Sequence, residues 1–259
     1  MEVNGIYSWS SIDQKRSNSP LLPHSLRGLI VGKSSCGKTT VLINLLLQPT
    51  WLDFNHLYVF GLSLHQMEYR MLEKGFSKGL SKEQISNLFT HQHVLQKNGI
   101  SPLTVLDEYT GPCNGEIKSE FYNDCSLIPD PADLDAAEKN LMIFDDCILE
   151  RQNKAEAFYT RGRHNNVNVI YISQNYFMLP RRSVRENANF IILFRQDIKN
   201  LNFIFADHCS YDMSSKEFHS FCKSVWDSAP YNFVTLDLTS SKSNGKYRKN
   251  LDHFYFPTT

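Results

Sequence analysis

The residues with the clearest chemical potential form a glycine-bounded loop at positions 32–39, which fits the phosphate-binding pattern G-x-x-x-x-G-K-[ST]. The apolar run at 26–31 predicts a buried strand before the loop, and residues 40–48 predict an apolar helix that ends before Pro49. In this context the backbone N–H groups of the loop face an anion at the positive end of the helix dipole. A glycine turn that fits the pattern by chance is the alternative, and both flanks argue against it. The expected nucleotide-binding residues are Gly32, Lys33, Ser34, Ser35, Cys36, Gly37, Lys38, Thr39 and Thr40.

Two side chains of this loop are expected to act directly on the bound nucleotide. Lys38 would reach the β- and γ-phosphates, and the hydroxyl of Thr39 would hold Mg²⁺. The pattern therefore predicts ATP and Mg²⁺ as cofactors, with Lys38 contributing to catalysis.

An apolar run that ends in two carboxylates predicts the second half of a phosphoryl-transfer site. Residues 141–144 are all apolar and lead into Asp145 and Asp146, as in a Walker B strand. Phosphoryl transfer needs Mg²⁺ beside the phosphates and a group that positions the attacking water. We expect Asp145 to hold Mg²⁺ and Asp146 to be the base or water-orienting residue, with Glu150 as a further candidate. Acidic residues also cap helices after strands, but together with the phosphate loop, expected on an adjacent strand, they favour catalysis.

Three further polar residues could complete the site. Gln174 follows the predicted strand 169–173, where its amide could contact the γ-phosphate or the attacking water. Arg161 and Arg163 lie just before that strand, and either could stabilise transition-state charge in the site of a neighbouring subunit. A solvated glutamine and surface arginines are the alternatives, and the sequence does not decide between the two arginines.

The charge balance excludes a strong net field. Lys and Arg together number 27, as do Asp and Glu, so the formal net charge is zero. Any contact with nucleic acid must therefore come from a local basic patch. Two clusters could supply one, although such clusters are more often solvated surface: Arg181, Arg182 and Arg185, and Lys246, Arg248 and Lys249.

Cysteine usage and hydropathy indicate a soluble intracellular protein. The six cysteines include no C-x-x-C pair, which favours reduced thiols over a disulfide framework or a zinc site. The amino-terminal segment lacks the apolar centre of a signal peptide, and no segment has the apolar length of a membrane span. We expect a cytoplasmic or nuclear location and no membrane partner.

The alternation of apolar and helical segments predicts an α/β fold. Several apolar runs are separated by helical segments, which predicts a three-layer P-loop NTPase with a mostly parallel central sheet covered by helices. We expect an N-terminal arm at 1–25 and one ATPase domain at 26–259, with a helical or irregular insertion at 62–139. Segments 232–238 and 246–256 predict a terminal pair of strands.

The order of these motifs resembles that of the FtsK–HerA superfamily of DNA-pumping ATPases. Within the superfamily, the chain is most similar to the genome-packaging ATPases of poxviruses, other large DNA viruses, virophages and Polinton-like elements. The resemblance spans about residues 26–256. Besides the two phosphate-site motifs, it rests on LYVF with LHQ at 57–66, RGRH at 161–164 leading to YISQ at 171–174, and VREN at 184–187 before an apolar strand that ends in LFR.

This resemblance implies a RecA/FtsK-like ATPase that forms a homo-oligomeric ring of five or six subunits around double-stranded DNA. Arg161 or Arg163 would complete the neighbour's site, and a capsid or portal protein would be the partner, at sites of virion assembly or within the virion. Many members of the superfamily carry glutamate where this chain has Asp146, which leaves the identity of the base open. Another DNA-translocating or helicase-type ATPase, or an ATP-gated switch with little turnover, is the alternative.

Overall fold

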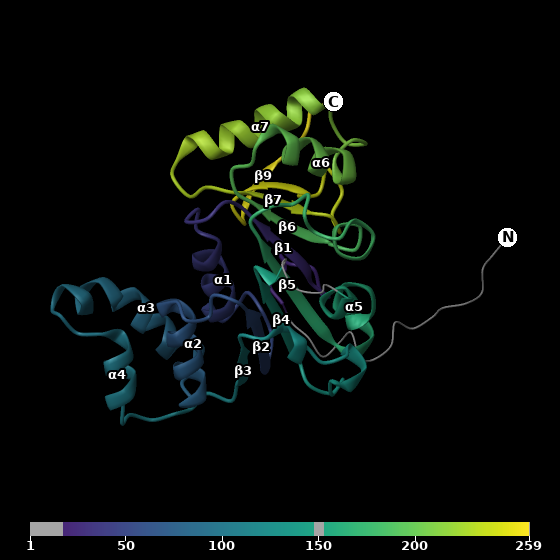
Figure 1. Cartoon of the computed structure of the whole chain (residues 1–259). Helices are drawn as coiled ribbons and strands as arrows, with labels where there is room; N and C mark the ends of the chain where they lie inside the picture. Colours follow the sequence, from purple (N-terminus) through teal and green to yellow (C-terminus); the bar gives the residue numbers. More distant parts are fainter. Residues whose placement is uncertain (1–17, 148–152, 259) are drawn as a thin grey trace.

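A nine-stranded sheet crosses the part of the chain that this computed structural model describes, residues 18–147 and 153–258 (Figure 1). The strand order is β3-β2-β4-β5-β1-β6-β7-β8-β9. The six strands from β3 to β6 are parallel, and the last three extend the sheet antiparallel. The strands are β1 (Arg27–Val31), β2 (His56–Gly61), β3 (Lys118–Tyr122), β4 (Asn140–Asp145), β5 (Val167–Ser173), β6 (Phe190–Leu193), β7 (Val234–Asp237), β8 (Tyr247–Lys249) and β9 (His253–Tyr255).

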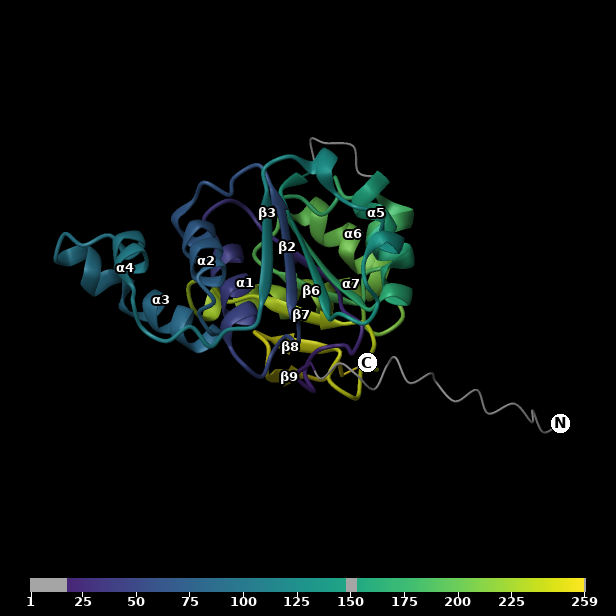
Figure 2. The same cartoon turned by 90° about the horizontal axis from the view of Figure 1, so that it is seen from below.

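Helices cover both faces of the sheet, which confirms the predicted three-layer α/β architecture. Figure 2 shows α1 and α2 on one face and α5 and α6 on the other. Each face buries its own apolar core, because alternate residues of a strand point to opposite faces. In β4, Phe144 packs toward α5 and Ile143 belongs to the core under α1. The α-helices are α1 (Lys38–Leu47), α2 (Met67–Ser77), α3 (Lys82–Lys97), α4 (Pro102–Glu108), α5 (Asn153–Arg161), α6 (Ile198–His208) and α7 (Ser215–Ser228).

The register of the central strands aligns their carboxyl ends. Val31 of β1 lies opposite Ser173 of β5, and Asp145 of β4 lies opposite Ile172 of β5. The segments that follow these three strands therefore begin at the same edge of the sheet. The prediction that the phosphate loop and the carboxylate pair follow adjacent strands is wrong, because β5 lies between β1 and β4.

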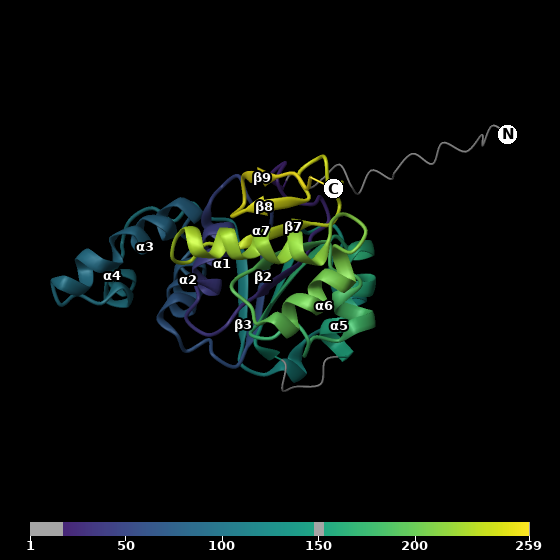
Figure 3. The same cartoon turned by 90° about the horizontal axis from the view of Figure 1, so that it is seen from above.

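The region 62–139, where a helical or irregular insertion is expected, contains α2, α3 and α4 and also a strand, β3, that the sequence does not reveal. β3 is a partly exposed edge strand that pairs with β2, and its polar start gives no alternation signal. Ser81 opens α3 with a capping box: its side chain accepts from the backbone N–H of Gln84, and the side chain of Gln84 accepts from the backbone N–H of Ser81. Helices α3 and α4 project away from the sheet, as Figures 1 and 3 show. Within α3, Ile85 is the buried residue.

Other local predictions need correction. The sequence Asp130-Pro131 predicts the start of a short helix, but the structure has one 3-10 turn, Pro131–Asp133. The sequence at 183–186 predicts a short capped helix, but Arg181–Arg185 forms a π-helical turn. The second terminal segment splits into β8 and β9. The arm predicted at 1–25 lies mostly outside the described residues, and Leu22 in its described part is buried.

Candidate active site

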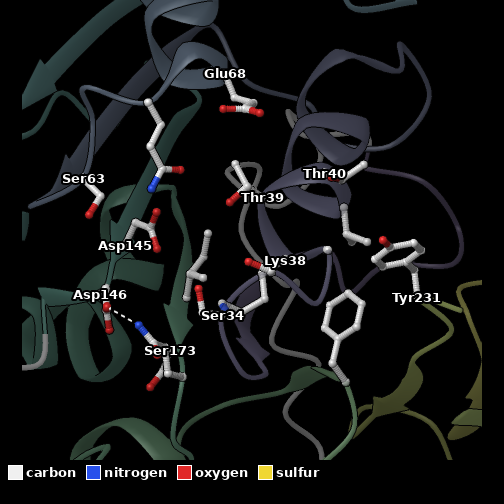
Figure 4. Close-up of a pocket in the computed structure, with 17 residues that line it drawn as sticks. Ser34, Lys38, Thr39, Thr40, Ser63, Glu68, Asp145, Asp146, Ser173 and Tyr231 are labelled. Carbon is white, nitrogen blue, oxygen red and sulfur yellow. Dashed lines mark hydrogen bonds between the residues drawn. The ribbon is translucent and has the colours of Figure 1, made fainter.

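The phosphate loop, the carboxylate pair and the glutamine converge on one cavity of about 720 Å³ at the carboxyl ends of the central strands (Figure 4). This is the size of a typical small-molecule site. The cavity is lined by nine of the predicted residues: Ser34, Ser35, Gly37, Lys38, Thr39, Thr40, Asp145, Asp146 and Gln174. The other predicted loop residues, Gly32, Lys33 and Cys36, shape the loop without lining the cavity.

The two loop glycines occupy positions that other residues would strain. A Cβ on Gly32 would lie 2.5 Å from Cys36 Sγ and 2.7 Å from Phe194 Cβ. Gly37 has a left-handed φ of 106° and begins α1 with no side-chain cap in the described structure. The first N–H groups of α1 consequently remain available to an anion at the positive end of the helix dipole.

Lys38 lies over this loop and holds two of its carbonyl groups. Its Nζ donates to the backbone oxygen of Gly32 at 2.7 Å and to that of Lys33 at 2.8 Å. A phosphate entering the loop would offer the ammonium group stronger, charge-assisted hydrogen bonds. The role predicted for Lys38 therefore requires its amine to exchange these carbonyl acceptors for phosphate oxygens.

Tyr69 joins the two residues predicted to hold Mg²⁺, and sequence reasoning missed it. This fully buried side chain of α2 donates from its hydroxyl to Asp145 Oδ2 at 2.5 Å and also shares a hydrogen bond with the Thr39 side chain. Burial raises the pKa of Asp145, and the hydrogen bond from Tyr69 opposes that effect. Burial and the nearby Asp145 raise the pKa of Tyr69, so its hydroxyl stays protonated and donates.

The residues at this point fit a magnesium ion. Mg²⁺ prefers hard oxygen ligands, with one or two carboxylates completed by phosphate oxygens and water. Thr39 and Asp145 offer a hydroxyl and a carboxylate whose positions are linked through Tyr69. A largely buried carboxylate with a raised pKa also gains from a cation beside it, because the cation favours its charged form.

Asp146 and Gln174 form a polar pair on the opposite side of the cavity from α1. Gln174 Nε2 donates to Asp146 Oδ2 at 2.8 Å. Asp146 has a left-handed φ of 53°, an uncommon conformation outside glycine that costs about 1 kcal/mol or more. Its backbone N–H donates to Ile172 O at 3.1 Å, so β5 holds both partners. The pair could orient a water molecule between the carboxylate and the amide.

Five other residues that line the cavity are not among the predicted site residues, although Gln66 and Phe194 belong to the LHQ and LFR segments of the family resemblance. They come from the segment after β2, from the end of β6 and from the segment before β7, which are distant in the chain. These residues are Ser63, Gln66, Glu68, Phe194 and Tyr231.

The two predicted arginines lie away from this cavity. Arg161 ends α5, where its Nη2 lies 3.0 Å from Asp130 Oδ2, and Arg163 is exposed in the following turn, Gly162–Asn165. Both precede β5, whereas the cavity follows it, and seven residues of strand span about 20 Å. Neither arginine reaches its own chain's cavity, and their role in a neighbouring site stays a prediction. Glu150 lies outside the described residues.

Comparison with known proteins supplies the fold but no sequence family. The sequence matches no protein-family model and no curated protein. The structure matches the genome packaging NTPase B204 from Sulfolobus turreted icosahedral virus 2 in complex with AMPPCP, at 13% identity and a TM-score of 0.50, over 87% of this chain and 96% of that one. The same NTPase in complex with sulfate matches with the same identity and TM-score over 90% and 98%. The chain therefore shares the α/β fold of this genome packaging NTPase.

VirB4 of Thermoanaerobacter pseudethanolicus is also similar, at 13% identity and a TM-score of 0.46, over 95% of this chain and 91% of that one.

None of the helices in the described part of the chain combines the length and the apolar composition needed to cross a bilayer.

Several basic side chains of the two clusters considered for DNA contact form ion pairs within the fold. Arg248 is buried and pairs with Asp237 at 2.5 Å, and Arg185 is buried with its Nη1 3.2 Å from Asp207. Lys246 pairs with Asp212. Because these three side chains form ion pairs within the fold, neither predicted cluster has all of its basic groups available for contact with DNA.

Removing the Tyr69 hydroxyl tests whether it positions Thr39 and Asp145, the residues predicted to hold Mg²⁺. We expect Tyr69→Phe to raise the Mg²⁺ concentration needed for half-maximal nucleotide binding or turnover about 10- to 100-fold, the usual effect of losing a group that orients a metal ligand. The Mg²⁺ dependence of mantATP binding and of phosphate release measures this. Tyr58→Phe, which removes a hydroxyl near His56 at the far end of β2, is the control. An unchanged Mg²⁺ requirement in Tyr69→Phe would contradict the role.

Proposed function

We propose that the chain hydrolyses Mg²⁺-ATP and uses the energy to move double-stranded DNA, most specifically to package a viral genome into a capsid. The observation that carries the proposal is the convergence of the phosphate loop, Asp145, Asp146 and Gln174 on one cavity. The structural match to a viral genome packaging NTPase supports the choice among DNA motors.

In this proposal each side chain acts on a different part of the reaction. The N–H groups of the loop and Lys38 hold the phosphates and neutralise charge that grows on the transferring phosphoryl group. Asp146 accepts the proton of the attacking water, and Gln174 orients both the carboxylate and the water through its amide. Thr39 and Asp145 would hold Mg²⁺, which when bound would supply further charge neutralisation.

The proposed assembly is a homo-oligomeric ring, a pentamer or hexamer, around the DNA. Arg161 or Arg163 of one subunit would then enter the site of the next, because neither reaches its own cavity. A capsid or portal protein would anchor the ring during packaging. We place this activity at sites of virion assembly in a host cell.

The proposed action on double-stranded DNA is tested by measuring ATP hydrolysis in three conditions: without DNA, with double-stranded DNA, and with DNA and procapsids that carry a portal. We expect DNA to stimulate hydrolysis and portal-bearing procapsids to stimulate it further while DNA becomes protected from nuclease. Stimulation by DNA with no effect of procapsids would point to another DNA translocase or helicase-type ATPase. Less than one turnover per subunit, with assembly that depends on nucleotide, would point to an ATP-gated switch.

A further inference from the structure

The cavity continues past α1 to a second end formed by aromatic residues. Phe194 is 2% exposed and lies under the phosphate loop, while Tyr231 is 71% exposed and also lines the cavity. A Cβ placed on Gly37 would lie 3.4 Å from the Phe194 ring and 3.6 Å from the Tyr231 ring. Figure 4 shows Tyr231 on one side of the loop and Asp146 on the other. The cavity thus has a polar end and an aromatic end with the phosphate loop between them.

The turn that carries Tyr231 is held in an uncommon conformation. Tyr231 has a left-handed φ of 63°, which is costly for a bulky residue. The next residue, Asn232, donates to Ser228 Oγ at 2.8 Å and accepts from Asn250 Nδ2 at 3.2 Å. Phe233 packs on Phe194, with ring centroids 5.4 Å apart. These contacts fix the turn and present a large apolar ring to the cavity mouth.

We propose that Tyr231 is the stacking platform for the nucleobase of the bound nucleoside triphosphate. The proposal rests on the proposed function only in requiring that the phosphate loop bind the triphosphate. With the phosphates at Lys38 and the γ-phosphate toward Asp146, the base lies toward the aromatic end of the cavity. The face of an aromatic ring can stack on any base, and the stacking energy is largest for purines because they offer more contact area. Tyr231 therefore favours purine over pyrimidine nucleotides.

The experiment compares ATP with inorganic tripolyphosphate, which has the phosphates and no base. Calorimetric titrations would use the wild-type protein, Tyr231→Phe, which keeps the ring, and Tyr231→Asn, which removes the ring while tolerating a left-handed φ. Tyr211→Asn removes a fully exposed tyrosine between α6 and α7 and is the control. We expect Tyr231→Asn to bind ATP about tenfold or more weakly, as for loss of one base–aromatic stack. Tripolyphosphate should bind all four proteins equally.

Three results would overturn the proposal. If Tyr231→Asn lost affinity for ATP and for tripolyphosphate equally, the ring would support the phosphate loop and not the base. If Tyr231→Phe lost as much ATP affinity as Tyr231→Asn, the effect would come from the hydroxyl group and not from the ring. Unchanged ATP affinity in Tyr231→Asn would exclude stacking. Failure of the wild-type protein to bind either probe would instead reject the proposed nucleotide site itself, so the two failures are distinguishable.

Discussion

Lys38→Ala is expected to reduce steady-state ATP hydrolysis by about 10²- to 10³-fold, the effect of removing one preorganised group from charge that develops in a transition state. The amine already lies within 2.8 Å of two loop carbonyl oxygens, so it is placed at the loop that would receive the phosphates. Phosphate release at saturating Mg²⁺ and ATP measures the change.

The control for this variant is Lys97→Ala, which removes an exposed lysine from the end of α3. It should keep wild-type turnover. Thermal unfolding of both variants should accompany the rates, because Lys38 also donates to the loop backbone and its loss could lower the melting temperature. Turnover near the wild-type level in a folded Lys38→Ala protein would refute the assignment of this loop as the catalytic phosphate site.

The second large expected effect follows from the proposal that Arg161 or Arg163 acts in the site of the neighbouring subunit. Loss of such a residue costs on the order of 10³-fold or more in rate. We expect Arg161→Ala or Arg163→Ala to lose this much activity alone. Mixing the inactive arginine variant with Lys38→Ala subunits should restore part of the activity, because some interfaces then combine an intact loop with an intact arginine.

The ion pair between Arg161 and Asp130 needs its own control. Asp130→Asn removes the charge of the partner and leaves Arg161 in place, so it should hydrolyse ATP at close to the wild-type rate. Exposed ion pairs of this kind contribute little to stability, about 0–1 kcal/mol. If neither arginine variant loses activity, or if neither mixture recovers any, the proposed action across subunits is wrong.

The central residues of the candidate site could be predicted because each lies at the carboxyl end of a strand or directly after it. The loop at 32–39 and Gln174 come immediately after β1 and β5, and the pair Asp145–Asp146 begins at the last residue of β4. In a parallel sheet these positions share one edge, and the observed register brings them to one cavity. Local pattern therefore sufficed for the polar end of the site.

The remaining features depend on contacts between distant parts of the chain. Tyr69 reaches Asp145 across 76 positions, and no motif distinguishes it from other apolar residues of α2. Tyr231 enters the cavity from the turn before β7, far from the phosphate loop in sequence. The position of β5 between β1 and β4 is likewise a matter of topology, which periodicity does not encode. The sequence does not predict the edge strand β3, because its residues are polar at the start and none of them is fully buried.

Release of phosphate from Mg²⁺-ATP by the purified wild-type protein, counted per subunit, tests the central claim most directly. The convergence of Lys38 and the Asp145–Asp146 pair on one cavity predicts many turnovers per subunit, faster with double-stranded DNA and abolished when Mg²⁺ is chelated. Release of less than one phosphate per subunit, with DNA and Mg²⁺ both present, would contradict it.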